Sequence, residues 1–124
     1  MSTVDKEQSL NLFAEADEYN WDDGLARLKE ILLDKNCELG TASLIYWRAQ
    51  PTYYKKYSSR DEAQPYEQEA FDLISDIEKR ALNGEFPVQY VSFDPNQDQV
   101  IDPEDPMTKK IPEILLKEVV ASEA

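Results

Sequence analysis

Residues 39–50, LGTASLIYWRAQ, constrain the fold of this chain more than any other stretch. Their side chains are apolar or small almost all the way round a helical projection, so a helix here needs neighbours on several sides. Gly40, Ala42 and Ser43 are small enough to let another helix approach closely. Pro51 disfavours a helical residue before it and is expected to end the helix. The stretch therefore predicts the central helix of a helical bundle.

Hydrophobic periodicity predicts four more helices around this central one. Apolar residues recur every three or four positions, as on the buried stripe of an amphipathic helix. These helices are expected from a cap at Ser2 or Thr3 to about Asp17, from about Asp22 to Asp34, from Pro65 to about Asn83, and over about residues 111–121.

Two segments near the C-terminus lack this helical period. Residues 88–93, VQYVSF, alternate apolar and polar side chains, which predicts one short strand or an extended segment. Residues 94–107 are rich in proline and aspartate and are expected to form a loop. With 124 residues, of which 41% are hydrophobic, the chain is expected to form one mainly α-helical domain over residues 1–124, a bundle of about five helices.

The composition also bears on where the protein works. The chain has no run of about 18 continuous apolar residues, so no membrane-spanning helix is expected. The N-terminal sequence MSTVDKEQSLNLF lacks the basic and apolar regions of a secretory signal. The single cysteine, Cys37, fits a reducing compartment. We therefore expect a cytoplasmic protein.

The charge of the chain narrows the choice of partners. The sequence contains 26 Asp and Glu against 13 Lys and Arg, which gives a formal net charge of -13. Such a surface repels nucleic acid and anionic membranes and attracts a basic protein. Solubility alone would also explain the acidity. A basic protein is the expected partner, and the sequence does not indicate an oligomeric state.

Groups that carry catalysis are scarce. The chain contains no histidine, which removes the commonest general base and the usual zinc ligand. Its three glycines leave no P-loop and no dinucleotide-binding fingerprint. Cys37 has no histidine to activate it and is expected to be buried. We expect no catalytic residue, no metal ligand and no cofactor, and hence a non-enzymatic protein.

The segment YNWDDG, residues 19–24, allows two interpretations. Asn20 is a good N-cap for the helix that follows, and Asp23 three residues later can complete a capping box. Trp21, with the carboxylates of Asp22 and Asp23, is alternatively an anchor for a partner, because tryptophan is enriched at interface hot spots. The helix start is the simpler interpretation, and the anchor is the functional one.

Tyr53, Tyr54 and Tyr57 are interleaved with Lys55 and Lys56. Aromatic rings beside lysines can stack on single-stranded nucleic acid. Two lysines in a chain of net charge -13 attract phosphate only weakly, however. The rings are therefore expected either to close one end of the bundle or to bind a protein.

Residues 94–105, DPNQDQVIDPED, have a spacing close to that of an EF-hand calcium loop. Asp94, Asn96 and Asp98 stand at the first, third and fifth positions. Gln99 stands at the sixth position, where the sharp turn needs glycine, and the twelfth position carries aspartate instead of the longer glutamate. A calcium-responsive module is thus an alternative, and a solvated acidic loop is the expected structure.

Four segments, LFAEADEYNWDDG, LLDKNCELGTASLIYW, DLISDIEKRALNGEF and SFDP, together resemble a family of small acidic bacterial proteins of uncharacterised function. Members of that family carry a Tyr-Asn-Trp-Asp-Asp-Gly segment, then an Asn-Cys-(Asp/Glu)-Leu-Gly-Thr-Ala segment that leads into an apolar helix. The resemblance covers about residues 10–95 and implies that Cys37 and Gly40 are packing residues. Members look like the immunity proteins encoded beside toxin genes, which implies a binding role in place of an enzymatic one.

These observations predict a protein that binds and inhibits a basic protein, most concretely an immunity protein that neutralises a cognate toxin by occluding its active site. Complementary charge across such an interface raises the association rate and the specificity. The expected binding residues are Glu15, Asp17, Glu18, Trp21, Asp22, Asp23, Tyr53, Tyr54 and Tyr57. The alternatives are a regulatory or scaffold domain that binds another cellular protein, and the calcium-responsive module at 94–105.

Overall fold

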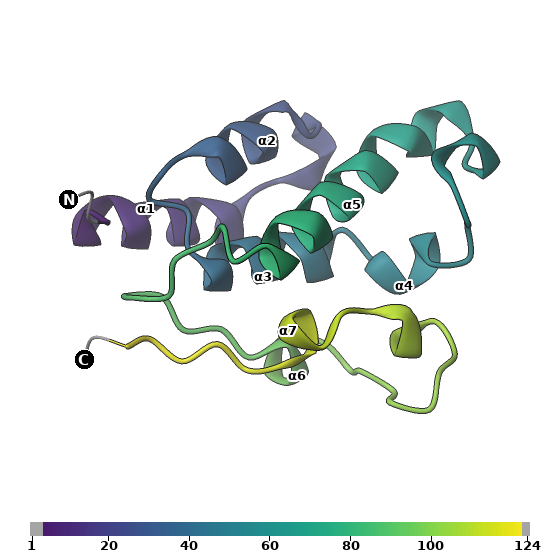
Figure 1. Ribbon diagram of the computed structural model, residues 1–124. Helices are drawn as coiled ribbons and strands as arrows, with labels where there is room; N and C mark the ends of the chain where they lie inside the picture. The colour runs from purple at the N-terminus through teal and green to yellow at the C-terminus, as the bar shows by residue number, and fades with distance from the viewer. Residues whose placement is uncertain (1–3, 123–124) are drawn as a thin grey trace.

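Helix α3, Leu39–Arg48, forms the centre of the fold, as its apolar sequence predicts. Every residue from Leu39 to Trp47 is buried, and the helix packs against α1, α4, α5 and α6. The computed structural model describes residues 4–122. In Figure 1, α3 lies between α2 above and the C-terminal segment that carries α6 and α7 below.

Six other helices occur in the described part of the chain, three of them longer than a single turn. The longer ones are α1 Lys6–Glu18, α2 Ala26–Leu33 and α5 Gln68–Leu82. The single-turn helices are α4 Pro51–Tyr54, α6 Pro95–Asp98 and α7 Glu113–Leu116. Short 3-10 turns are η1 Trp21–Asp23, η2 Arg60–Glu62, η3 Pro65–Glu67 and η4 Thr108–Lys110. The prediction of a single, mainly α-helical domain is confirmed, and no helix within residues 4–122 is long and apolar enough to cross a membrane.

Helix α1 is capped by Asp5. The Asp5 carboxylate accepts a hydrogen bond from the backbone N–H of Gln8 at 3.0 Å, which satisfies one of the free donors of the first turn. Ser2 and Thr3, the expected caps, lie outside the described residues. The helix ends at Glu18, one residue beyond the predicted end.

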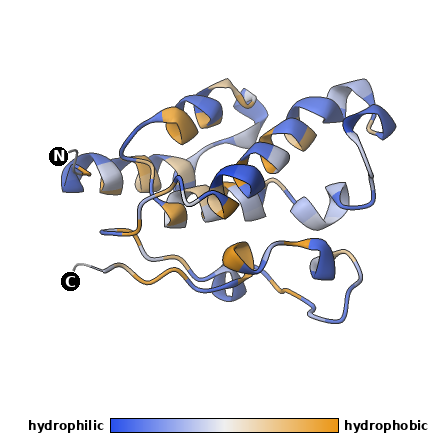
Figure 2. Ribbon diagram, viewed as in Figure 1, coloured by the Kyte–Doolittle hydropathy of each residue, from blue (hydrophilic) through white to orange (hydrophobic). Residues whose placement is uncertain are grey.

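Helix α2 begins later than the predicted start at Asp22. Residues 21–23 form η1, and Gly24 follows with a positive φ of 89°, which interrupts the helical path. Helix α2 starts only at Ala26 and has no side-chain cap. Figure 2 shows a hydrophobic stripe beside a hydrophilic one on both α2 and α5. On α2 the buried residues are Leu28, Ile31 and Leu32.

Helix α5 has the boundaries that its sequence predicts, to within three residues. Pro65 opens η3, which leads directly into the helix. At the other end Gly84 has a φ of 71° and donates its N–H to the Ala81 carbonyl. The next N–H, of Glu85, donates to the Arg80 carbonyl at 3.0 Å. This pair of hydrogen bonds is the Schellman motif, which ends helices at glycine.

The C-terminal helix predicted over about residues 111–121 forms only over Glu113–Leu116, so its predicted length is wrong. Helix α7 makes a single turn, and the chain after it is extended. In a longer helix the Leu115 carbonyl would accept the Val119 N–H, but it accepts the indole N–H of Trp47 at 2.8 Å. The Val119 N–H donates instead to the Phe93 carbonyl at 2.7 Å. Two long-range hydrogen bonds therefore replace the helical one.

Residues 88–93 are non-helical, as their alternating pattern predicts, but they form no continuous strand, because the chain bends at Gln89 and Tyr90. They meet the C-terminal segment at an isolated antiparallel bridge between Phe93 and Val119. The predicted loop at 94–107 contains one helical turn, α6, which Asp94 caps with its carboxylate. Proline at the first position of α6 suits that turn, because its missing N–H would have had no helical partner.

Glu38, the residue before α3, holds residues 89–91 against the core. Its side chain is fully buried. One carboxylate oxygen, Oε1, accepts hydrogen bonds from the backbone N–H groups of Gln89, Tyr90 and Val91 at 2.8, 2.8 and 3.0 Å. Hydrogen bonds to a charged acceptor are stronger than neutral ones, and they offset the cost of removing the carboxylate from water.

Gly40 and Cys37 are buried packing residues, as the family resemblance implies. A Cβ on Gly40 would lie 2.7 Å from Cγ1 of Val91 and 3.1 Å from the Val91 carbonyl oxygen. The neighbour that needs this space is Val91 of a non-helical segment, and not a second helix as the small side chains suggested. Cys37 is 2% exposed.

Replacing Glu38 with glutamine tests the role of this carboxylate. The amide oxygen can still accept these three N–H groups, but the negative charge is lost. The NH2 group also takes the place of Oε2, which accepts the Tyr90 N–H at 3.0 Å. We expect Glu38→Gln to lower the free energy of unfolding by about 2–4 kcal/mol, measured by urea denaturation. The exposed Glu104→Gln is the matched control and is expected to change it by less than about 0.5 kcal/mol. Equal effects of the two substitutions would contradict this role of Glu38.

Candidate functional site

The YNWDDG segment folds into a capped 3-10 turn. The side-chain oxygen of Asn20 accepts the backbone N–H of Asp22 at 3.0 Å. The Tyr19 hydroxyl donates to the carbonyl of Gly24 at 2.6 Å and closes the loop. Asn20 is thus a cap, as predicted, but it caps η1 and not α2. Within residues 4–122 no hydrogen bond from the Asn20 backbone N–H to the Asp23 carboxylate completes the predicted capping box.

Trp21 lies partly inside the protein and packs against the hydrophobic core. Its ring meets the edge of Tyr19 at a centroid distance of 6.4 Å. The indole N–H is buried and has no hydrogen-bond acceptor among the described residues. Only part of the Trp21 ring is therefore available to a partner.

A shallow depression on the surface brings together several of the predicted acidic residues. We call it the acidic hollow. Its polar lining comes from the end of α1 and the turn that follows: Glu15, Glu18, Tyr19, Asn20 and Asp23. Three carboxylates that are separate in the sequence thus share one concave surface beside an aromatic ring.

The carboxylates of the acidic hollow differ in how far they are neutralised. Arg27 donates two hydrogen bonds to the Glu15 carboxylate, from Nε at 2.6 Å and from Nη2 at 2.7 Å. These bonds lower the pKa of Glu15 below its ordinary value. Glu18 and Asp23 form no ion pair with any cation in residues 4–122, and neither does the neighbouring Asp22. The hollow therefore keeps two unneutralised negative charges.

Asp17 is not part of the acidic hollow. Its carboxylate and its carbonyl both accept hydrogen bonds from Arg48, at 2.7 and 2.6 Å. The same guanidinium pairs with Asp98 at 2.8 Å, and these two partners raise the pKa of Arg48. Arg48 thus links Asp17 of α1 to Asp98 of α6, and its one positive charge is shared between the two carboxylates.

The three predicted tyrosines form one cluster at the end of α4. The ring centroid of Tyr53 lies 5.0 Å from that of Tyr54 and 6.3 Å from that of Tyr57. The hydroxyls of Tyr53 and Tyr57 both donate to the buried carboxylate of Glu67, at 2.7 Å for Tyr57. These hydrogen bonds lower the pKa of Glu67 and raise that of Tyr57.

Sequence reasoning missed Glu67, although its local signal was present. Glu67 also accepts the backbone N–H of Gln64 at 3.1 Å, which forms a capping box at the start of η3. A Gln-Pro-x-Glu pattern before a long amphipathic helix indicates such a cap. Nothing in the sequence pairs Glu67 with the tyrosines, so the second role emerges only in the fold.

The acidic segment at 94–105 does not form the calcium loop that its spacing suggests. Asp94 caps α6, and Asp98 pairs with Arg48. The carboxylate of Asp102 accepts a backbone N–H two residues further along. Within residues 4–122 no three acidic or cysteine side chains are grouped so that they could hold a metal ion. The carboxylates of Asp94 and Asp102 thus stabilise local turns, whereas that of Asp98 holds α6 to α3.

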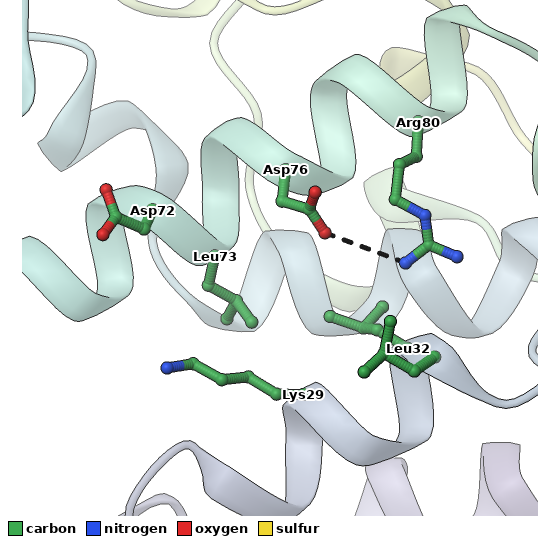
Figure 3. A pocket seen from close by; sticks show the side chains of 7 residues that line it. Lys29, Leu32, Asp72, Leu73, Asp76 and Arg80 are labelled. Carbon is green, nitrogen blue, oxygen red and sulfur yellow. Dashed lines mark ion pairs between the residues drawn. The ribbon is translucent and has the colours of Figure 1, made fainter.

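An apolar groove between α2 and α5 is a second feature that sequence reasoning missed. It has a volume of about 260 Å³, and its apolar surface comes from Leu32, Leu33 and Leu73. Figure 3 shows Lys29 and Leu32 of α2 facing the side chains of α5 across the groove. The charged residues of α5 beside it are Asp72, Asp76 and Arg80, of which the last two lie 3.7 Å apart. Leu33 could have indicated the groove from the sequence, because it is an apolar residue off the buried stripe of α2. In the structure it is 77% exposed.

Cys37 does not provide a nucleophile. Its thiol is buried beside α3, and burial raises its pKa to about 12. A thiol with such a pKa is almost entirely protonated at neutral pH, whereas the thiolate is the reactive form. Burial also keeps substrates away from the sulfur atom.

Comparison with known proteins adds one family. The model of a family described as a domain of unknown function (DUF4274) matches residues 5–82, which run from the cap of α1 to the end of α5. This span is more than half of the chain. No curated protein and no solved structure matches the sequence.

The lowered pKa of Glu67 makes a prediction about pH. A group with a lower pKa in the folded state stabilises the protein above its unfolded pKa, near 4.3, and this stabilisation is lost as the pH falls through the folded pKa. We expect the wild type to be more stable than Glu67→Gln at neutral pH, and the difference to shrink below about pH 4.3. Urea denaturation from pH 7 to pH 3 measures this difference in stability.

A second variant tests the hydrogen bond from Tyr53 to Glu67. In Tyr53→Phe the Glu67 carboxylate loses a donor, so its pKa, followed by ¹³C NMR, should rise. An unchanged titration of Glu67 would contradict this hydrogen bond.

Proposed function

The chain belongs to the DUF4274 family, a domain of unknown function, and from that premise we propose that it is a non-enzymatic protein that binds and inhibits a basic protein. The most concrete form of this proposal is an immunity protein that neutralises a cognate toxin. The acidic hollow is the docking point. A basic loop of the partner enters it, and the bulk of the domain then covers the partner's active site.

The observation that carries the proposal is the pair of unneutralised carboxylates in the hollow. Glu18 and Asp23 converge on one concave surface, while the neighbouring Glu15 is already paired with Arg27. Free carboxylates attract a cationic side chain at long range and then bind it by charge-assisted hydrogen bonds. The half-buried rings of Tyr19 and Trp21 offer apolar contact beside them.

The distribution of chemical groups supports binding over catalysis. The chain has no histidine, and its one thiol is buried with a raised pKa. The pairs of acidic residues around the hollow lie on an open surface, whereas general acid–base catalysis uses carboxylates whose pKa is tuned in an enclosed site. A protein of net charge -13 gains association rate when its target is basic.

The decisive experiment compares two double variants with equal charge. Glu18→Gln/Asp23→Asn removes two negative charges from the hollow, and Asp102→Asn/Glu104→Gln removes two from a loop elsewhere. The tagged wild type captures partners from the source cells, and a salt gradient elutes them. We expect one basic partner that leaves as salt rises, and an association rate about tenfold lower for the hollow variant only. The protein should also block the activity of that partner.

Two outcomes would contradict the proposal. One is a partner whose association rate falls equally in both double variants, because total charge and not the hollow would then be responsible. The other is the absence of any basic partner, in which case the acidity serves solubility. A partner that binds but keeps its activity would leave binding in place and remove inhibition.

The apolar groove favours a second candidate function, a regulatory or scaffold domain that binds another cellular protein. Leu33 exposes 77% of its surface beside the groove, and exposed apolar surface of this kind marks interaction sites. Binding there would depend on apolar contact and would change little with salt.

Leu33 and Leu82 form a matched pair for testing this alternative. Both are exposed leucines on helices, at 77% and 66%, but Leu33 lines the groove and Leu82 does not. If the groove is the docking point, Leu33→Ala should weaken partner binding about tenfold, measured by calorimetry, while Leu82→Ala leaves it unchanged. Insensitivity to Leu33→Ala, together with loss in the hollow variant, would favour the immunity protein.

A further inference from the structure

The tyrosine cluster already holds a cation. The ammonium nitrogen of Lys56 lies 3.7 Å from the ring centroid of Tyr53 and 5.1 Å from that of Tyr57. The two rings stand at 85° to each other, so they form two walls of a corner around the charge. Both distances fall within the range in which a cation is attracted to the face of an aromatic ring.

Glu67 makes this corner rigid and more attractive to a cation. Its buried carboxylate binds the hydroxyls of both rings, so neither ring can turn away without breaking a charge-assisted hydrogen bond. Donation of a phenol hydrogen to an anion also raises the electron density of the ring, which strengthens its attraction for a cation. The charge of the carboxylate itself acts in the same direction.

Lys56 is a weakly held occupant of this corner. It is exposed, and no ion pair of its ammonium group occurs within the described residues. Its neighbour Lys55 differs, because Lys55 is bound to the carboxylate of Glu78 at 2.5 Å. An exposed lysine can leave an aromatic face at a small cost, since water solvates the ammonium group again.

We propose that Tyr53, Tyr57 and Glu67 form a binding site for an alkylammonium group, and that Lys56 occupies this site in the free protein. The cation that displaces Lys56 in the complex is a lysine side chain of the basic partner. This second statement rests on the proposed function, whereas the existence of the site does not. The site then gives the tyrosines a defined role in binding, with Lys56 as an internal competitor.

Tetramethylammonium is a suitable probe, because it fits an aromatic corner and cannot donate a hydrogen bond to Glu67. Its binding is followed by NMR through the ring resonances of Tyr53 and Tyr57 at constant ionic strength. A competitor held by exposed cation–π contacts that stabilise it by about 0.5–1 kcal/mol in total occupies most of the site, so Lys56→Ala should bind the probe about three- to sixfold more tightly than the wild type. Lys55→Ala removes the same charge one position away and should bind it as the wild type does.

Tyr53→Leu in the Lys56→Ala background should abolish the saturable shift of the Tyr57 resonances. Far-UV circular dichroism and thermal melts establish that each variant is folded. Equal affinity in the wild type and Lys56→Ala, an equal gain in Lys55→Ala, or binding that survives Tyr53→Leu would each overturn the site. No partner protein enters this experiment, so its failure is separate from failure of the proposed function. If the probe binds but no basic partner exists, only the assignment of the cation to a partner's lysine falls.

Discussion

A buried carboxylate is the contact on which the rest of this fold depends. Glu38 stands at the start of the central helix α3 and binds the N–H groups of three consecutive residues, 89–91. A buried charge that loses its partners destabilises a protein by several kcal/mol, about 3–5 in measured cases. These hydrogen bonds therefore hold residues 89–91 against the start of α3. One side chain thus sets the path of a segment 51–53 positions away.

The segment after the DUF4274 match completes the core and does not merely cover it. Val91 fills the space that Gly40 leaves on α3. Leu115 is fully buried and its carbonyl accepts the indole N–H of Trp47, also on α3. Without these residues the central helix would expose apolar surface and leave buried polar groups without partners. The region matched at residues 5–82 therefore depends on the following segment for its stability.

Local patterns in the sequence predicted the helices, and long-range contacts decided the rest. The all-round apolar stretch of α3 and the stripe of α5 depend only on residues a few positions apart, so they could be found directly. The helix predicted over 111–121 ends early because the Leu115 carbonyl accepts its hydrogen bond from Trp47, 68 positions away. The predicted start of α2 was wrong for a local reason, because Gly24 has a positive φ and the helix begins only after it. The carboxylate of Glu38 has no local signal at all.

The same limit governs the candidate site. Charge alone picks out residues 15–23, but it does not show which carboxylates remain available. Asp17 is paired with Arg48, 31 positions away, whereas Glu18 and Asp23 line the acidic hollow without a cation from the described residues. A cationic group of a partner can bind the carboxylates of Glu18 and Asp23 directly, whereas those of Asp17 and Glu15 already accept hydrogen bonds from Arg48 and Arg27. The net charge of -13 therefore favours a positively charged partner, and the ion pairs of the fold determine which carboxylates remain available to bind it.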